Sequence, residues 1–123
     1  MAAAATDALH RKMGIVAAAV SDETPPGHVA HLIGRSVAAH ESVPFAIYAF
    51  LRTPGDFRTV LETAILNGGD RDTLGAMACA ATGAYVGERA LPEAWLAKLE
   101  DRDALAALGT ALADTFPGPA HAS

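Results

Sequence analysis

The chain has 123 residues with a formal net charge of −5, and 51% of them are hydrophobic but only 6% aromatic. The acidic balance argues against a nucleic-acid partner, and no apolar run reaches the roughly 18 residues that cross a bilayer. The single cysteine, Cys79, excludes an internal disulfide and fits a reducing compartment, so we expect a cytoplasmic protein of one domain.

The chain is predicted to be all-α, because apolar residues recur at spacings of three and four and no stretch alternates as a strand would. Alanine dominates the apolar fraction and is the best helix former, which favours closely packed helices. Pro-rich and Gly-rich breaks separate the helical segments. We expect helices at about 6–20, 26–33, 43–53, 57–66, 70–87, 92–99 and 101–115, and a frayed tail at 116–123.

Several of these helices have recognisable end residues. Ser42 is expected to cap the third helix, with Pro44 in its first turn, where the missing N–H costs nothing. Asp56 is expected to cap the fourth helix, and Pro92 to take the first helical position of the sixth. The run Asn67-Gly68-Gly69 should end the fourth helix, because glycine accepts the left-handed conformation found at helix C-termini.

The fifth helix carries a row of small residues. Gly75, Cys79, Gly83 and Gly87 recur every four residues and therefore share one face. Glycine costs about 1 kcal/mol against alanine inside a helix, and close approach of a neighbouring helix is the usual compensation. We therefore expect this face to be tightly packed, with Cys79 as a small core residue rather than a nucleophile.

The start of that helix carries the strongest chemical signal in the chain. Asp70, Asp72 and Thr73 bring two carboxylates and a hydroxyl close together in the sequence. Such groups cap helices, because they satisfy free N–H groups and oppose the helix dipole. They are also the oxygen ligands that Mg²⁺ prefers. Spacing leaves both interpretations open, and it supplies half of a metal site at most, because the sequence has no second acidic cluster of this kind.

Longer stretches carry a resemblance to a known family. They are GRSVAAHESVP at 34–44, AIYAFLR at 46–52, the whole of 67–87, and LPEAW at 91–95. Together they resemble the C-terminal part of an ADP-ribosylglycohydrolase over roughly residues 7–115. The ordered set of motifs makes this resemblance more specific than the acidic helix start alone.

The resemblance implies an all-α orthogonal helical bundle that forms part of the larger family fold. It implies two Mg²⁺ ions in the complete site, with Mn²⁺ as the substitute, and hydrolysis that releases ADP-ribose from a modified protein or small acceptor. The metal ligands that it implies are Asp70, Asp72 and Thr73. The contacts to ADP-ribose that it implies are Gly34, Ser36, Val37 and Ser42, although the residues of this loop, taken singly, fit a plain connector equally well.

The chain also departs from the family pattern. Arg71 replaces a threonine that is usual between the two aspartates, and Cys79 replaces a glycine. The glutamate and second acidic segment of the family's N-terminal half have no counterpart here, so no residue is assigned as catalytic. We expect a fragment, split-gene product or remnant, with little activity alone and a site completed by a second chain or a homodimer.

A second interpretation belongs to another class of protein. The chain would then be a catalytically silent helical module that binds ADP-ribose or a protein partner. In either case, helices without their neighbours should expose apolar surface. We therefore expect a dimer or poor solubility.

Overall fold

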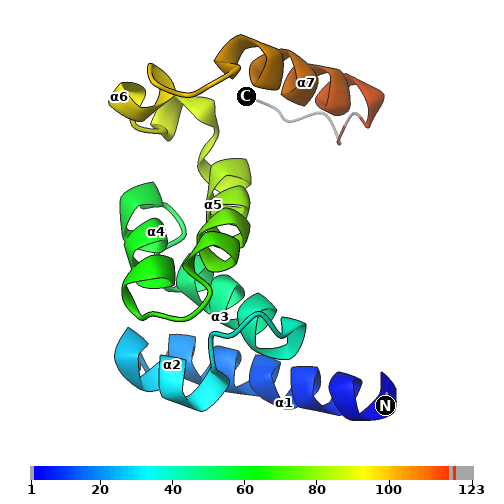
Figure 1. Ribbon diagram of the computed structural model, residues 1–123, viewed down its shortest axis with the longest axis vertical. Helices are drawn as coiled ribbons and strands as arrows, with labels where there is room; N and C mark the ends of the chain where they lie inside the picture. The colour runs from blue at the N-terminus through cyan, green and yellow to red at the C-terminus, as the bar shows by residue number, and fades with distance from the viewer. Residues whose placement is uncertain (1, 117, 119–123) are drawn as a thin grey trace. The chain divides into compact units, whose positions relative to one another are not determined.

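The computed structural model describes residues 2–116 and 118, and side chains from Thr6 onward. Every regular element among those residues is helical, so the all-α prediction is confirmed (Figure 1). Most of the predicted tail at 116–123 lies outside the described residues. The elements are α1 (Ala2–Ser21), α2 (Pro26–Ile33), α3 (Ala39–Arg52), α4 (Phe57–Leu66), α5 (Arg71–Val86), the 3₁₀ helix η1 (Glu88–Ala90), α6 (Glu93–Leu96) and α7 (Arg102–Thr115).

The contacts between residues divide the chain into two compact units, whereas the sequence suggested one domain. The first unit is Met1–Ala90 and the second is Leu91–Ser123. The first unit holds α1 to α5 and every residue of the predicted site. The second unit holds α6 and α7.

Helix α3 is the centre of the first unit, because it packs against α1, α2, α4 and α5 (Figure 1). Its Phe45 and Tyr48 side chains are fully buried, with ring centroids 5.8 Å apart. Burial raises the pKa of Tyr48, whose hydroxyl donates a hydrogen bond of 2.9 Å to the carbonyl of Thr24. The rest of the core is small or branched: Val16, Ala19, Val29, Ala30, Ile33, Ala46, Ala49, Val60, Ala64, Leu74 and Ala78.

The prediction that Ser42 caps the third helix is wrong. Helix α3 begins at Ala39, and its N-cap residue Ala38 supplies no side-chain hydrogen bond. Ser42 lies inside the helix and is only 3% exposed. The expected place of Pro44 in the first turn is wrong too, because it lies inside the helix, where its missing N–H leaves the carbonyl of His40 without the usual i→i−4 partner.

The other helix ends follow the sequence closely. Helices α2 and α4 have the predicted bounds, and Asp56 caps α4 as expected. Helix α6 is shorter than predicted, and Pro92 is its N-cap residue rather than its first helical residue. Asp101, where the last helix was expected to begin, directly precedes α7.

The small-residue face of α5 is tightly packed at one position only. A Cβ at Gly75 would lie 3.3 Å from Cγ2 of Ile65 on α4, so the expected close approach occurs there. A Cβ at Gly83 or Gly87 would meet no described atom within 4 Å, so the prediction is wrong at these two positions. Cys79 is half-buried, and burial raises the pKa of its thiol, which agrees with a packing role.

The second unit leaves apolar side chains exposed. Leu105, Leu108 and Leu112 follow one another at helical spacing on α7, and each is at least 50% exposed. We call these three residues the leucine stripe. Among the described residues, no helix combines the length and the apolar character needed to cross a membrane.

Candidate functional site

Two connecting segments that are far apart in the sequence meet in the first unit. We call residues 34–38, between α2 and α3, the contact loop, and residues 67–73, from the end of α4 into α5, the acidic turn. The amide of Asp70 donates a hydrogen bond of 2.8 Å to the carbonyl of Arg35. The fold therefore places the predicted metal ligands beside most of the predicted contacts to ADP-ribose.

The acidic turn needs its two glycines. Gly68 and Gly69 have φ angles of +80° and +77°, a region that glycine occupies without steric cost. A Cβ at Gly69 would also overlap the carbonyl oxygen and the side-chain stem of Arg35. The predicted end of α4 at these glycines is confirmed. The glycines have a second role that the sequence did not indicate, because they form the surface on which the contact loop lies.

Asp70 precedes α5 but does not cap it through its side chain. It holds the N-cap position, and its carboxylate accepts no hydrogen bond from the amides of the first turn. Asp56 provides the contrast, because its carboxylate accepts hydrogen bonds of 3.1 Å from the amide and 2.8 Å from the hydroxyl of Thr59. These bonds, chiefly the one from the amide, lower the pKa of Asp56. The carboxylate of Asp70 is therefore free for another partner.

The other two predicted metal ligands face solvent. Asp72 and Thr73 lie in the first turn of α5 and are exposed, as is Arg71 between the aspartates. Across the described residues, no group of three or more His, Cys, Asp or Glu side chains could hold a metal ion. Asp70, Asp72 and Thr73 thus offer two carboxylates and one hydroxyl as oxygen donors.

The contact loop is fixed from within by Glu41 of α3. The hydroxyl of Ser36 donates a hydrogen bond of 2.8 Å to the Glu41 carboxylate and accepts one of 3.2 Å from the amide of Ala38. The same carboxylate fills the space that a Cβ at Gly34 would need, and Gly34 has a φ of +89°. Glycine is therefore required at position 34 for two separate reasons.

Lys12 of α1 holds the beginning of the contact loop. Its ammonium group donates hydrogen bonds of 2.6 Å to the carbonyl of Ile33 and 3.1 Å to that of Leu32. These carbonyls end α2, where a cation also interacts favourably with the helix dipole. The contact loop is thus anchored by residues from α1, α3 and the acidic turn.

The four predicted contacts to ADP-ribose do not share one environment. Gly34, Ser36 and Val37 lie together in the contact loop, and Val37 is 82% exposed. Ser42 is buried within α3. Sequence reasoning missed Arg35, Glu41 and Lys12 as residues that shape the site. Arg35 and Glu41 lie in the same motif as Gly34, which is a sequence signal that could have indicated them.

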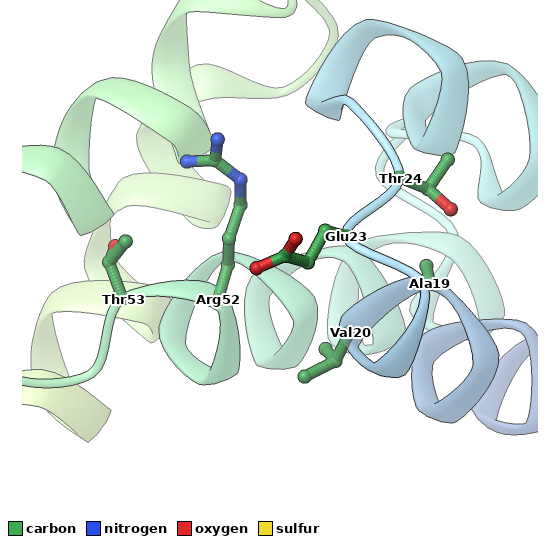
Figure 2. Close-up of a pocket in the computed structure, with 6 residues that line it drawn as sticks. All are labelled: Ala19, Val20, Glu23, Thr24, Arg52 and Thr53. Atoms are coloured by element: carbon green, nitrogen blue, oxygen red, sulfur yellow. The ribbon is translucent and has the colours of Figure 1, made fainter.

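A separate pocket of about 420 Å³ lies at the C-terminal end of α3. Figure 2 shows the Glu23 carboxylate pointing toward the aliphatic stem of Arg52 across this pocket. The hydroxyl of Thr53, which also lines it, is buried without a hydrogen-bond partner. No residue of the acidic turn or the contact loop lines this pocket, so it is distinct from the candidate site.

The chain belongs to the ADP-ribosylglycohydrolase family, because the family model matches residues 1–122. ADP-ribosylhydrolase ARH3 of Bos taurus is 37% identical over 94 residues, which cover 68% of this chain and 26% of the bovine protein. ARH3 of Mus musculus is 44% identical over 73 residues, covering 51% of this chain and 20% of the mouse protein.

An uncharacterized protein of Archaeoglobus fulgidus is 38% identical over 80 residues, which cover 65% of this chain and 25% of that protein. The chain thus spans only a fifth to a quarter of the length of these three relatives. No solved structure matches it. The family match extends beyond the stretch at 7–115 that carried the resemblance in the sequence.

Proposed function

We propose that this chain forms one wall of an ADP-ribosylglycohydrolase active site, which releases ADP-ribose from a modified protein or a small acceptor. Its relatives named ADP-ribosylhydrolase support this reaction class. The observation that carries the proposal is the carboxylate of Asp70, which is free of its own helix and lies in a turn held against the contact loop.

The donor set fits a hard divalent cation. Asp70, Asp72 and Thr73 offer only oxygen atoms, as Mg²⁺ and Mn²⁺ prefer, and the exposed positions of Asp72 and Thr73 leave them accessible. Three donors do not complete an octahedron, so the remaining ligands are water and groups outside this chain. When bound, such ions lower the pKa of a water molecule and orient the hydroxyls of a sugar.

The contact loop supplies the surface on which the ligand rests. Val37 presents an exposed apolar side chain, and Gly34 shapes the loop through its φ of +89°, with the Glu41 carboxylate packed where a Cβ would lie. The hydroxyl of Ser36 already donates its hydrogen bond to Glu41, so toward a ligand it acts as an acceptor. Ser42 would contribute by holding α3 in place from within.

No residue of this chain is proposed as the catalytic acid or base. Because the chain spans about a quarter of the length of its relatives, we propose that this group lies on a segment or partner outside it. Purified alone, the 123-residue chain should show little or no release of ADP-ribose. Robust turnover by the isolated chain would contradict this part of the proposal.

A second candidate is a catalytically silent module that binds ADP-ribose or a protein. It is favoured by the lack of any group of three or more His, Cys, Asp or Glu side chains that could hold a metal ion in the described part of the chain. The two candidates differ in one respect that can be measured. The hydrolase wall binds ADP-ribose more tightly when Mg²⁺ is present, and the silent module does not depend on the metal.

Isothermal titration with ADP-ribose, with and without Mg²⁺, separates the two candidates. The chain contains a matched control, because Asp101-Arg102-Asp103 repeats the sequence Asp70-Arg71-Asp72 at the start of another helix. The D70N/D72N variant should lose the magnesium-dependent part of the affinity, about tenfold or more. The D101N/D103N variant, with the same change of charge, should retain it. Equal loss in both variants would contradict the assignment.

A further inference from the structure

We propose that Arg35 is a positioning residue, which holds the acidic turn in place against the contact loop through its carbonyl and its side-chain stem. The proposal rests on the proposed function for the identity of the ligands. The contact that carries it exists without any ligand, so it can be tested separately.

The side chain of Arg35 lies against the glycine pair of the acidic turn. A Cβ at Gly69 would overlap the Cβ and Cγ atoms of Arg35, which lie directly against the glycine backbone. A Cβ at Gly68 would lie 3.5 Å from Nε and 4.0 Å from Nη2 of the same arginine. One side chain therefore lies close to both residues that precede Asp70.

Packing, rather than charge pairing, keeps this side chain in place. Nε of Arg35 is buried and has no hydrogen-bond partner among the described residues. An unpaired buried N–H is unfavourable, so the contact of the stem with the glycine backbone must outweigh this cost. The part of Arg35 that matters for the turn is thus its Cβ and Cγ atoms, together with its carbonyl oxygen.

The position of the turn decides what the carboxylate of Asp70 can do. With the Asp70 amide bonded to the Arg35 carbonyl, the side chain of Asp70 makes no bond to the amides of α5. If the turn loosened, Asp70 could rotate into the capping arrangement that Asp56 shows. That arrangement would compete with binding of a metal ion, so Arg35 would act on the metal through Asp70.

Two measurements on the full chain test this role. NMR follows hydrogen exchange at the Asp70 amide, and electron paramagnetic resonance gives the Mn²⁺ affinity. Replacing Arg35 by alanine removes the stem beyond Cβ, and R35A should exchange the Asp70 amide about tenfold faster and bind Mn²⁺ about tenfold more weakly. R35K and R35M keep Cβ and Cγ and should retain wild-type exchange and affinity. R11A, a change at an exposed arginine of α1, should alter neither quantity.

The outcomes separate the two proposals. Exchange and Mn²⁺ affinity in R35A equal to wild type would overturn the positioning role. R35K and R35M keep the stem, so changes in exchange and affinity as large as those in R35A would overturn it too. If the wild-type chain binds no Mn²⁺ while exchange of the Asp70 amide depends on the stem at position 35, the positioning role stands and the magnesium proposal fails.

Discussion

Asp56 and Asp70 hold the same position, directly before α4 and α5, yet only Asp56 turns its carboxylate onto its own helix. The difference lies in what surrounds each residue. Asp56 is followed by Thr59, which donates from both its amide and its hydroxyl. Asp70 follows two glycines whose backbone is pressed against Arg35. The two aspartates therefore provide, within one chain, a structural cap and a carboxylate available to a ligand.

The stabilising effect of Asp56 should depend on pH. Hydrogen bonds from Thr59 hold the folded-state pKa of Asp56 below its ordinary value of 3.8, so the ionised form stabilises the fold. Relative to D56N, the wild-type chain should be more stable to urea at neutral pH. This stability advantage should shrink once the pH falls below 3.8, and it should be lost as the pH passes through the lower pKa of the folded state. An advantage that grows on acidification would contradict the cap.

Alanine at Gly69 should be far more damaging than alanine at Gly87. Both glycines border α5 and have positive φ angles, +77° and +80°, so both substitutions strain the backbone. Only at Gly69 would the new Cβ overlap Arg35, which adds about 1–3 kcal/mol of overpacking. Urea unfolding of G69A and G87A measures the difference directly. Equal losses would show that the contact loop does not press on the acidic turn.

Alanine at Gly83 should stabilise the isolated chain. No described atom lies within 4 Å of the new Cβ, and glycine-to-alanine exchange inside a helix gains about 0.5–1 kcal/mol. At Gly75 the same gain is offset, because Cγ2 of Ile65 lies 3.3 Å from the new Cβ and must move. Thermal unfolding should therefore rank G83A above wild type and G75A below G83A. A G83A variant less stable than wild type would instead indicate that a neighbour packs against α5 at this position, as the sequence suggested.

The leucine stripe of α7 should drive self-association. Leu105, Leu108 and Leu112 are each at least 50% exposed, and exposed apolar patches promote association. In light scattering at increasing concentration, the wild-type chain should form dimers or larger species, and L108E should shift the distribution toward monomer. As a control, V37E introduces the same charge at another exposed apolar residue, in the contact loop, and should not. A wild-type chain that stays monomeric at high concentration would contradict this expectation.

The sequence was sufficient for most of the fold because its signals were local. Asp56 as a cap and the glycines at 68 and 69 as a helix end depend on neighbouring residues only, and both predictions are confirmed. Ser42 misled because a hydroxyl two residues before a proline is a good local start signal, whereas α3 begins three residues earlier, at Ala39, and holds Pro44 in its interior.

The site was less accessible to sequence reasoning, because its organisation depends on contacts over long separations. The sequence motifs indicated Asp70, Asp72 and Thr73 as site residues. No local signal indicates that Arg35 lies against Gly69 or that Lys12 binds the end of α2. The small-residue face of α5 failed for the same reason. Spacing predicts which residues share a face, but only tertiary structure decides whether a neighbour covers it.

Paramagnetic broadening by Mn²⁺ in the ¹⁵N-labelled chain tests the central claim most directly, because it reports where the metal binds rather than whether it binds. The account predicts that the amides of residues 70–74, and then those of the contact loop, broaden first as Mn²⁺ is added. The amides next to Asp56 and those of residues 101–103 should stay sharp. Broadening that is equally strong at residues 101–103, or absent from the start of α5, would contradict the account.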